Sequence, residues 1–226
     1  MSSTPASTKP LQVSPAPRNL VSPPRNNIVQ DDINPEVSYL VLRHPHTKEY
    51  LHCPIDTADI PLIRNYKWRI DVMPSGNIPY VATGAFVEGR DGTRKITLQL
   101  LLLNRVGVQD QKQVDHINGP VFGGLDNRRS NLRLVTRKQN LQNSAGRRIT
   151  TRTSQFKGIV WRKKDQVWTA QIKIGPKLLH LGTFRDEIEA AKAYDYAAYH
   201  FHREYAFLNF PEALGFNVSY PFGVSA

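Results

Sequence analysis

Short apolar segments separated by turn residues fill the first half of the chain and restrict what it can fold into. Between residues 37 and 108 the runs SYLVLRH, EYLHCPI, YKWRIDV, IPYVATGAF and KITLQLLL have the length and composition typical of β-strands. The segment IDTADIPLIRNY (55–66) predicts one short helix, with Asp56 or Thr57 as its N-cap. The run LQLLLL (98–103) is far below the roughly 18 apolar residues of a membrane span, so it indicates a buried strand or helix.

The middle of the chain predicts a strand, a loop, a second strand and a helix. These elements lie within VDHINGPVFGGLDNRRSNLRLVTRKQN, where NG and GG mark turns and LRLV is the second strand candidate. Thr136, followed three residues later by Gln139, forms a capping box. A helix is therefore expected to begin near Arg137 and to end near Gly146, a typical C-terminal glycine.

The last part of the chain predicts three strands followed by one helix. The strand candidates are FKGIVWR, VWTAQIKI and LLHLGTF, and Asp186 with Glu189 forms a second capping box. The helical segment EAAKAYDYAAYHF places four apolar residues on one stripe, which the small alanines allow to lie close against a sheet. These stripe residues are Ala190, Tyr194, Ala197 and Phe201.

These patterns predict an α+β protein of five parts. The parts are a disordered Pro/Ser-rich tail (1–36), a β-rich domain (37–146), a basic linker (147–155), a second domain (156–212) and a C-terminal tail (213–226). Within the β-rich domain, the segment at about 96–146 contains the candidate site residues. The first tail has too few large apolar groups to order itself. Its lack of acids before Asp31 leaves an organelle transit peptide as an alternative.

Positive charge gathers in one stretch of the chain. The formal net charge is +11, and residues 128–164 contain Lys or Arg at 12 positions with no Asp or Glu. Such a field favours a polyanionic partner such as DNA, and the alternative is a solvated basic surface without a partner. The single cysteine, Cys53, excludes internal disulfides and cysteine-rich zinc sites and fits an intracellular setting.

Four polar residues of the middle segment have the chemistry needed to cut a phosphodiester. An acid and an amide, Asp115 and Asn140, offer oxygen ligands to one hard divalent cation, Mg²⁺ or Mn²⁺. An imidazole, His116, titrates near neutral pH and would act as general base. Asn131 precedes the second strand and would hold the histidine loop by hydrogen bonds. The alternatives are Asn143 as the ligand, or a structural Asp-His pair beside a polar turn at DNRRSN.

The motifs VDHING, LDNRRSNLR and TRKQNLQN resemble the HNH endonuclease family, which has a ββα-metal fold. The resemblance to phage and intron homing endonucleases implies that Asp115 and Asn140 bind the metal, His116 is the general base and Asn131 braces it. The GPVFGG loop is longer than usual by roughly three residues, which loop entropy tolerates. Relatives often carry a His-Arg pair where this chain has Gln99 and Leu100.

The segment from about 156 to 211 resembles the plant ethylene-response-factor (Apetala-two) DNA-binding domain, through KGI, WTAQI, HLGTF, EIEAA, AYDYAA and LNF. The resemblance implies a three-stranded antiparallel sheet on one helix, with the sheet in the DNA major groove. Val160 and Leu178 stand where plant domains tend to place arginine, so the plant target sequence does not transfer.

Two groups of side chains are candidates for contact with DNA. The candidate base-contacting residues are Lys157, Arg162, Gln171, Lys173 and His180. The candidate phosphate-contacting residues of the turns are Lys163, Lys164 and Lys177, and Arg128, Arg129 and Arg133 of the middle segment complete the DNA-binding set.

Taken together, the sequence predicts a metal-dependent HNH DNA endonuclease, similar to homing endonucleases, whose C-terminal domain selects the site on double-stranded DNA. It would act as a monomer, away from membranes, in the cytoplasm or nucleoid of a bacterial or phage-infected cell. The first alternative is a DNA-binding or transcription factor with an inactive HNH remnant. The second is a nonspecific nuclease whose C-terminal domain adds only affinity.

Overall fold

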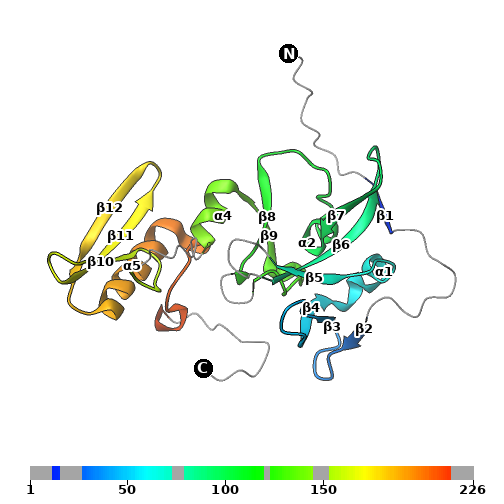
Figure 1. The fold of residues 1–226 in the computed structure, drawn as a ribbon, viewed down its shortest axis with the longest axis horizontal. Helices are drawn as coiled ribbons and strands as arrows, with labels where there is room; N and C mark the ends of the chain where they lie inside the picture. Colours follow the sequence, from blue (N-terminus) through cyan, green and yellow to red (C-terminus); the bar gives the residue numbers. More distant parts are fainter. Residues whose placement is uncertain (1–11, 16–26, 73–78, 120–122, 145–152, 215–226) are drawn as a thin grey trace, which may run out of the picture. The chain divides into compact units, whose positions relative to one another are not determined.

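The computed structural model describes residues 12–15, 27–72, 79–119, 123–144 and 153–214, and it has the predicted α+β class, with mainly antiparallel sheets and few helices (Figure 1). The chain divides into two compact units, residues 1–140 and 141–226. In the described part of the chain, no helix has both the length and the apolar character needed to cross a membrane.

The first unit contains three small antiparallel sheets around one apolar core. The sheets have the orders β2-β3-β4, β1-β6-β5 with β7 also paired to β6, and β8-β9. Their strands are β1 (Val13–Pro15), β2 (Asn27–Gln30), β3 (Val37–Arg43), β4 (Tyr50–Asp56), β5 (Arg69–Val72), β6 (Pro79–Val87), β7 (Thr93–Thr97), β8 (Lys112–His116) and β9 (Leu132–Thr136). The core collects fully buried residues from β3, β4, α1 and α2, including Leu40, Ile55, Ile63 and Leu98.

Two short pieces of the segment predicted to be disordered (1–36) form strands. Residues of β1 pair with β6, and residues of β2 pair with β3, both in antiparallel register. Edge strands of this kind are held by the backbone hydrogen bonds of an existing sheet, so they need few apolar side chains of their own. The absence of large apolar groups, on which the prediction rested, is therefore a poor guide at a sheet edge.

Helices of the first unit are short, and one of them replaces part of a predicted strand. KITLQLLL divides into β7 and the helix α2 (Leu98–Leu102), because Leu98, Leu101 and Leu102 all reach the core at helical spacing. The segment expected to hold a short helix forms η1 (Thr57–Asp59) and α1 (Ile60–Ile63). Asp56 is the N-cap residue of η1, one of the two predicted positions, but neither helix has a side-chain hydrogen bond at its N-cap.

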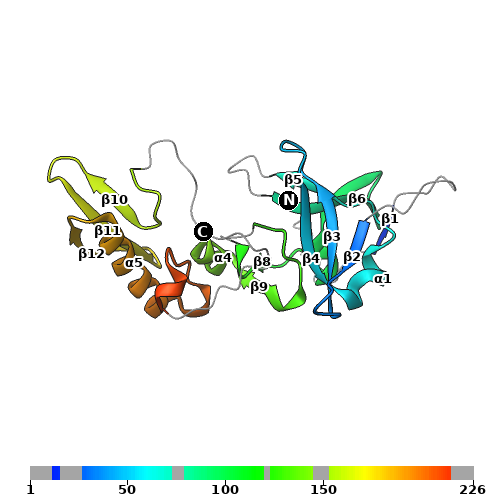
Figure 2. The same ribbon diagram turned by 90° about the horizontal axis from the view of Figure 1, so that it is seen from below.

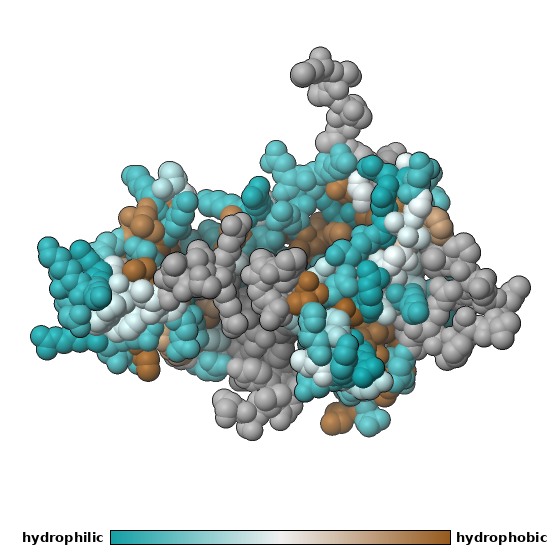
Figure 3. Space-filling view, in the orientation of Figure 1, coloured by the Kyte–Doolittle hydropathy of each residue, from teal (hydrophilic) through white to brown (hydrophobic). Residues whose placement is uncertain are grey.

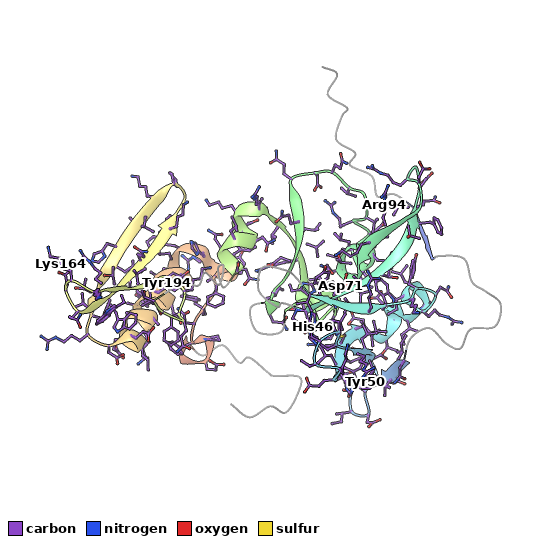
Figure 4. The ribbon with its side chains drawn as sticks, in the orientation of Figure 1. His46, Tyr50, Asp71, Arg94, Lys164 and Tyr194 are labelled. Carbon is purple, nitrogen blue, oxygen red and sulfur yellow. The ribbon has the colours of Figure 1, made fainter. Side chains whose placement is uncertain are left out.

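The second unit is a three-stranded antiparallel sheet with one long helix on one face (Figure 2). Its strands are β10 (Ile159–Arg162), β11 (Val167–Ile174) and β12 (Lys177–Phe184), and its helices are α5 (Glu187–His202), η3 (Arg203–Tyr205) and η4 (Pro211–Leu214). The Oδ1 of Asp186 accepts a hydrogen bond from the Glu189 amide, as the capping box predicts. Ala190, Ala197 and Tyr194 are buried against the sheet, and Figure 4 shows Tyr194 between helix and sheet.

One residue of the predicted helical stripe is misplaced. Phe201 is 53% exposed, because the apolar contact that closes the end of the helix comes instead from the segment after it. There Asp195, buried on α5, accepts hydrogen bonds from the backbone amides of Asn209 and Phe210. The described end of the predicted linker also belongs to this unit, since Thr153 accepts a hydrogen bond from the Trp161 amide. Linker residues 147–152 lie outside the described residues.

Candidate functional site

The predicted order of strand, loop, strand and helix is present as β8, β9 and α4 (Arg137–Asn143). β8 and β9 pair antiparallel from Lys112 with Thr136 to His116 with Leu132. The capping box forms, because the Gln139 side chain accepts from the Thr136 amide at 2.8 Å and the Thr136 hydroxyl accepts from the Gln139 amide at 3.3 Å. The predicted helix end at Gly146 lies outside the described residues.

The imidazole of His116 is buried at the end of β8, with 8% of the residue exposed. Its Nε2 lies 3.3 Å from the Oδ1 of Asn127. The Nδ2 of Asn127 donates to the carbonyls of Gly124 and Leu125, so the amide presents its oxygen to the histidine. Nε2 must then carry the hydrogen, which makes Nδ1 the basic nitrogen of the ring.

Burial lowers the pKa of His116 below its ordinary value. The hydrogen bond to Asn127 and the negative charges of Asp115 and Asp126 act in the opposite direction, but burial is the larger effect. The imidazole is therefore neutral at pH 7 and can accept a proton. Both carboxylates lie close enough for the ring to sense their charge.

Asn131 ties the two ends of the loop that follows His116. Its Oδ1 accepts from the Asn118 amide at 3.0 Å, and its Nδ2 donates to the Asn118 side chain and to the carbonyl of Asp126. Its own carbonyl accepts from the Ile117 amide at 2.9 Å. This geometry suits the bracing role that the sequence suggests, because it holds the backbone next to His116 in one conformation.

Sequence analysis missed Asp126 and Asn127, which it considered only as part of a polar turn. They are 1% and 0% exposed, and a polar residue buried so deeply requires hydrogen-bond partners. Asp126 accepts from Asn118 and Arg128, and Asn127 contacts His116 directly. The sequence shows that these two residues lie between the loop glycines and the second strand. It contains no pattern that predicts the burial of an Asp-Asn pair.

The side chains of Asp115 and His116 project from opposite faces of β8, because the pairing with β9 continues in regular register through both residues. The carboxylate of Asp115 is bound by its cross-strand neighbour: the Nε of Arg133 lies 2.9 Å from Oδ2. Asn140 on α4 donates from Nδ2 to the Oε1 of Gln113 at 2.9 Å. Gln113 and Asp115 share one face of β8, so Asn140 lies over the same face as Asp115.

The donor types at this face fit one hard divalent cation. Asp115 supplies a carboxylate, and the hydrogen bond from the Nδ2 of Asn140 leaves its carbonyl oxygen as the available ligand atom. Asn143, the alternative ligand, is buried, whereas Asn140 is partly exposed. Among the described residues there is no group of three or more His, Cys, Asp or Glu side chains with metal-site geometry. Any ion would depend on water and phosphate oxygens for most of its ligands.

Each of the three arginines of the middle segment has an acidic partner within the first unit, and their contact with DNA stays a prediction. Arg128 binds Asp126 at 2.7 Å, Arg129 binds Asp59 at 2.8 Å and Arg133 binds Asp115 at 2.9 Å. Asp59 lies 70 residues before its partner in the chain. Guanidinium groups with such partners are poor candidates for counter-ions of a phosphate backbone.

Lys157 also has an internal role where a DNA contact was predicted. Its Nζ donates to the carbonyls of Gln142 and Ser144 at 2.6 Å each, at the end of α4, and lies 5.1 Å from the centre of the Phe207 ring. Carbonyls at a helix end have no intrahelical partners, and an ammonium group satisfies them. The charge of Lys157 therefore stabilises its own unit.

Of the remaining candidates, Arg162, Gln171, Lys173 and His180 lie on the sheet face opposite α5, and Lys177 begins β12 opposite Ile174, on the other face. Cross-strand pairs place Arg162 beside Val167, Gln171 beside His180 and Lys173 beside Leu178. Lys163 and Lys164 follow β10 at the exposed turn, where Figure 4 labels Lys164. The side chains of these basic residues and of His180 are exposed, and Gln171 is half-buried.

No protein-family model matches the chain, and no curated protein matches it significantly.

Proposed function

We propose that this chain is a metal-dependent endonuclease of the HNH type that hydrolyses a phosphodiester of double-stranded DNA. The observation that supports this most is His116, an imidazole held neutral by burial, whose Nε2 donates to Asn127 and whose pKa is influenced by the charges of Asp115 and Asp126. The opposite face of β8 offers carboxylate and amide oxygens to a cation, at Asp115 and Asn140, so the proposal requires a phosphate at the end of β8 that the ion and the imidazole both reach.

His116 would act as the general base. With Nε2 donating to Asn127, its Nδ1 takes a proton from a water aimed at phosphorus. The loop held by Asn131 keeps the ring in place during this transfer, so that little reorganisation is needed. The lowered pKa keeps the base available at neutral and slightly acidic pH.

Asp115 and Asn140 would hold the divalent ion, Mg²⁺ or Mn²⁺. When bound, such an ion supplies positive charge to the scissile phosphate and the departing oxygen. Asp115 would share its carboxylate between that ion and Arg133, which also keeps the carboxylate oriented. The second unit would hold the DNA through its basic sheet face and turn. The protein would work inside the cell, as a monomer.

A nicking assay on supercoiled plasmid with Mg²⁺ tests this proposal. We expect the wild type to nick and His116→Ala to lose about 10² to 10⁴-fold in rate. The matched control is His46→Ala, which removes an exposed histidine from the turn between β3 and β4 and should nick like the wild type. Equal nicking by His116→Ala and wild type would exclude His116 as the base.

One observation favours a second candidate, a DNA-binding factor with an inactive HNH remnant. The ion pair between Asp115 and Arg133 occupies one oxygen of the predicted metal ligand. If wild type and His116→Ala both bind DNA and neither nicks with Mg²⁺ or Mn²⁺, this second candidate replaces the first.

A further inference from the structure

The outer face of the β10–β12 sheet combines cations at its ends with neutral groups in its middle. No Asp or Glu occurs in the three strands. Arg162 lies at one end and Lys173 near the other, while the central pair is Gln171 with His180. Strands without carboxylates and with basic groups at their ends match the charge of a duplex, and one of these groups, Arg162, also pairs with the exposed Asp165 of the adjoining turn at 3.3 Å.

Two aliphatic side chains on this face are exposed. Val160 is 40% exposed and lies opposite Thr169, and Leu178 is 62% exposed and lies opposite Lys173. In Figure 3 this unit has a mostly hydrophilic surface with apolar residues among the polar ones. One exposed aliphatic residue needs no explanation, but two among the basic and amide groups of one face suggest a ligand with small apolar groups.

The major groove offers one such group at its base edges. The C5-methyl group of thymine is apolar, whereas the guanine edge presents two acceptors that call for Arg or Lys. Glutamine can bind adenine through N6 and N7, and every A·T pair carries that adenine edge together with the thymine methyl. Val160, Leu178 and Gln171 are therefore complementary to A·T pairs and poorly suited to guanine.

We propose that this sheet face selects a target with a core of A·T pairs, through thymine-methyl contacts at Val160 and Leu178 and an adenine contact at Gln171. This rests on the proposed binding of DNA but not on its cleavage. Lys163 and Lys164 at the adjoining turn contact phosphates and contribute affinity without base preference.

The first experiment is a binding selection. The full chain carrying His116→Ala, with EDTA present, is used to retain duplexes from a randomised library, and the retained DNA is sequenced. We expect an A·T-rich core. A G·C-rich core, or no preference at all, overturns the inference while leaving the nicking result unaffected.

The second experiment replaces thymine by deoxyuridine in the selected duplex, one position at a time. Deoxyuridine keeps the base pairing and lacks only the methyl group. We expect about a fourfold loss of affinity for each methyl contact. The Leu178→Ala variant should bind duplexes with thymine or uracil equally well at one of these positions. The Val160→Ala variant should lose the same preference at a different position. Equal binding of thymine and uracil throughout by the wild type overturns the inference.

A matched control is Ile188→Ala, which removes an exposed aliphatic residue from α5 and should leave every thymine preference intact. A gain-of-contact variant is Leu178→Arg, which should move the preference at its position towards guanine. Failure of the chain to retain any duplex would remove the proposed DNA partner, and this inference with it.

Discussion

Both units contain many basic residues, and they use this positive charge differently. In the first unit Arg128, Arg129 and Arg133 face acids of the same unit, and all three of these acids are buried. In the second unit the cations of the sheet face and turn are exposed, and Arg162 has an exposed partner, Asp165, at 3.3 Å. The density of basic residues in a sequence therefore says little about how many are available to a polyanion.

The sharpest way to separate the two units is to unfold one of them. Gly158 has a φ of 80°, and a Cβ at this position would lie 2.0 Å from the Tyr194 ring and 2.8 Å from the Gln171 carbonyl. We expect Gly158→Ala to destabilise the second unit by more than about 4 kcal/mol. Urea unfolding followed by tryptophan fluorescence measures this. The control is Gly175→Ala, at a φ of 58° with open space around it, which should cost only about 1 kcal/mol.

The next test concerns the internal ion pairs of the first unit. The side chains of Arg133 and Asp115 are 16% and 8% exposed, so Arg133→Ala leaves a buried carboxylate and should cost about 3 kcal/mol or more. The side chain of Arg129 is 48% exposed, so water can replace it beside the buried Asp59 carboxylate, and Arg129→Ala should cost less than Arg133→Ala. If both variants lost the same free energy of unfolding in urea, the exposure of these side chains would not determine the strength of their ion pairs.

The two units should also respond to pH in opposite directions. Burial lowers the pKa of His116, so its contribution to stability is present above about pH 6.5 and is lost as pH falls through the folded pKa. Burial raises the pKa of Asp195 despite its hydrogen bonds to Asn209 and Phe210. Its contribution is present below the unfolded pKa of about 3.9 and is lost as pH rises through the folded pKa.

Thermal unfolding from about pH 3 to pH 8 measures both effects. His116→Ala should flatten the acid side of the first unit's profile, and Asp195→Asn should flatten the profile of the second. Unchanged pH profiles in these variants would mean that other groups control the response of each unit.

The smallest expected effect is on the salt dependence of DNA binding. Lys164→Ala should weaken binding to all duplexes alike and reduce the slope of log affinity against log salt by about 1. Arg129→Ala should leave the slope unchanged, since its guanidinium binds Asp59. Fluorescence anisotropy with a labelled duplex at several salt concentrations measures both slopes. A reduced slope in Arg129→Ala would show that the ion pair between Arg129 and Asp59 breaks when DNA binds.

Local patterns predicted the local structure well. The strand VWTAQIKI coincides with β11, the Thr136–Gln139 capping box forms, and Asp186 caps α5 through the Glu189 amide. These features depend on neighbours within a few residues, which a sequence contains. The four candidate site residues were found in the same way, although their roles in cleavage and metal binding stay predictions.

What the sequence could not predict depends on partners far along the chain. Nothing near Arg129 indicates an acid 70 residues away, and nothing near Lys157 indicates helix carbonyls that need a cation. The burial of Asn127 likewise results from packing of the loop against the first unit's strands, where its backbone amide donates to the carbonyl of Pro54 on β4. Tertiary contacts of this kind decide which polar groups serve chemistry and which serve stability.

The strands β1 and β2 have a practical consequence for anyone who trims this chain. A version that starts at Val37 would lose the outer partners of β6 and β3. Bare strand edges with unpaired amides and carbonyls attract other chains. Such a shortened protein would tend to self-associate, although the removed segment looks dispensable by composition.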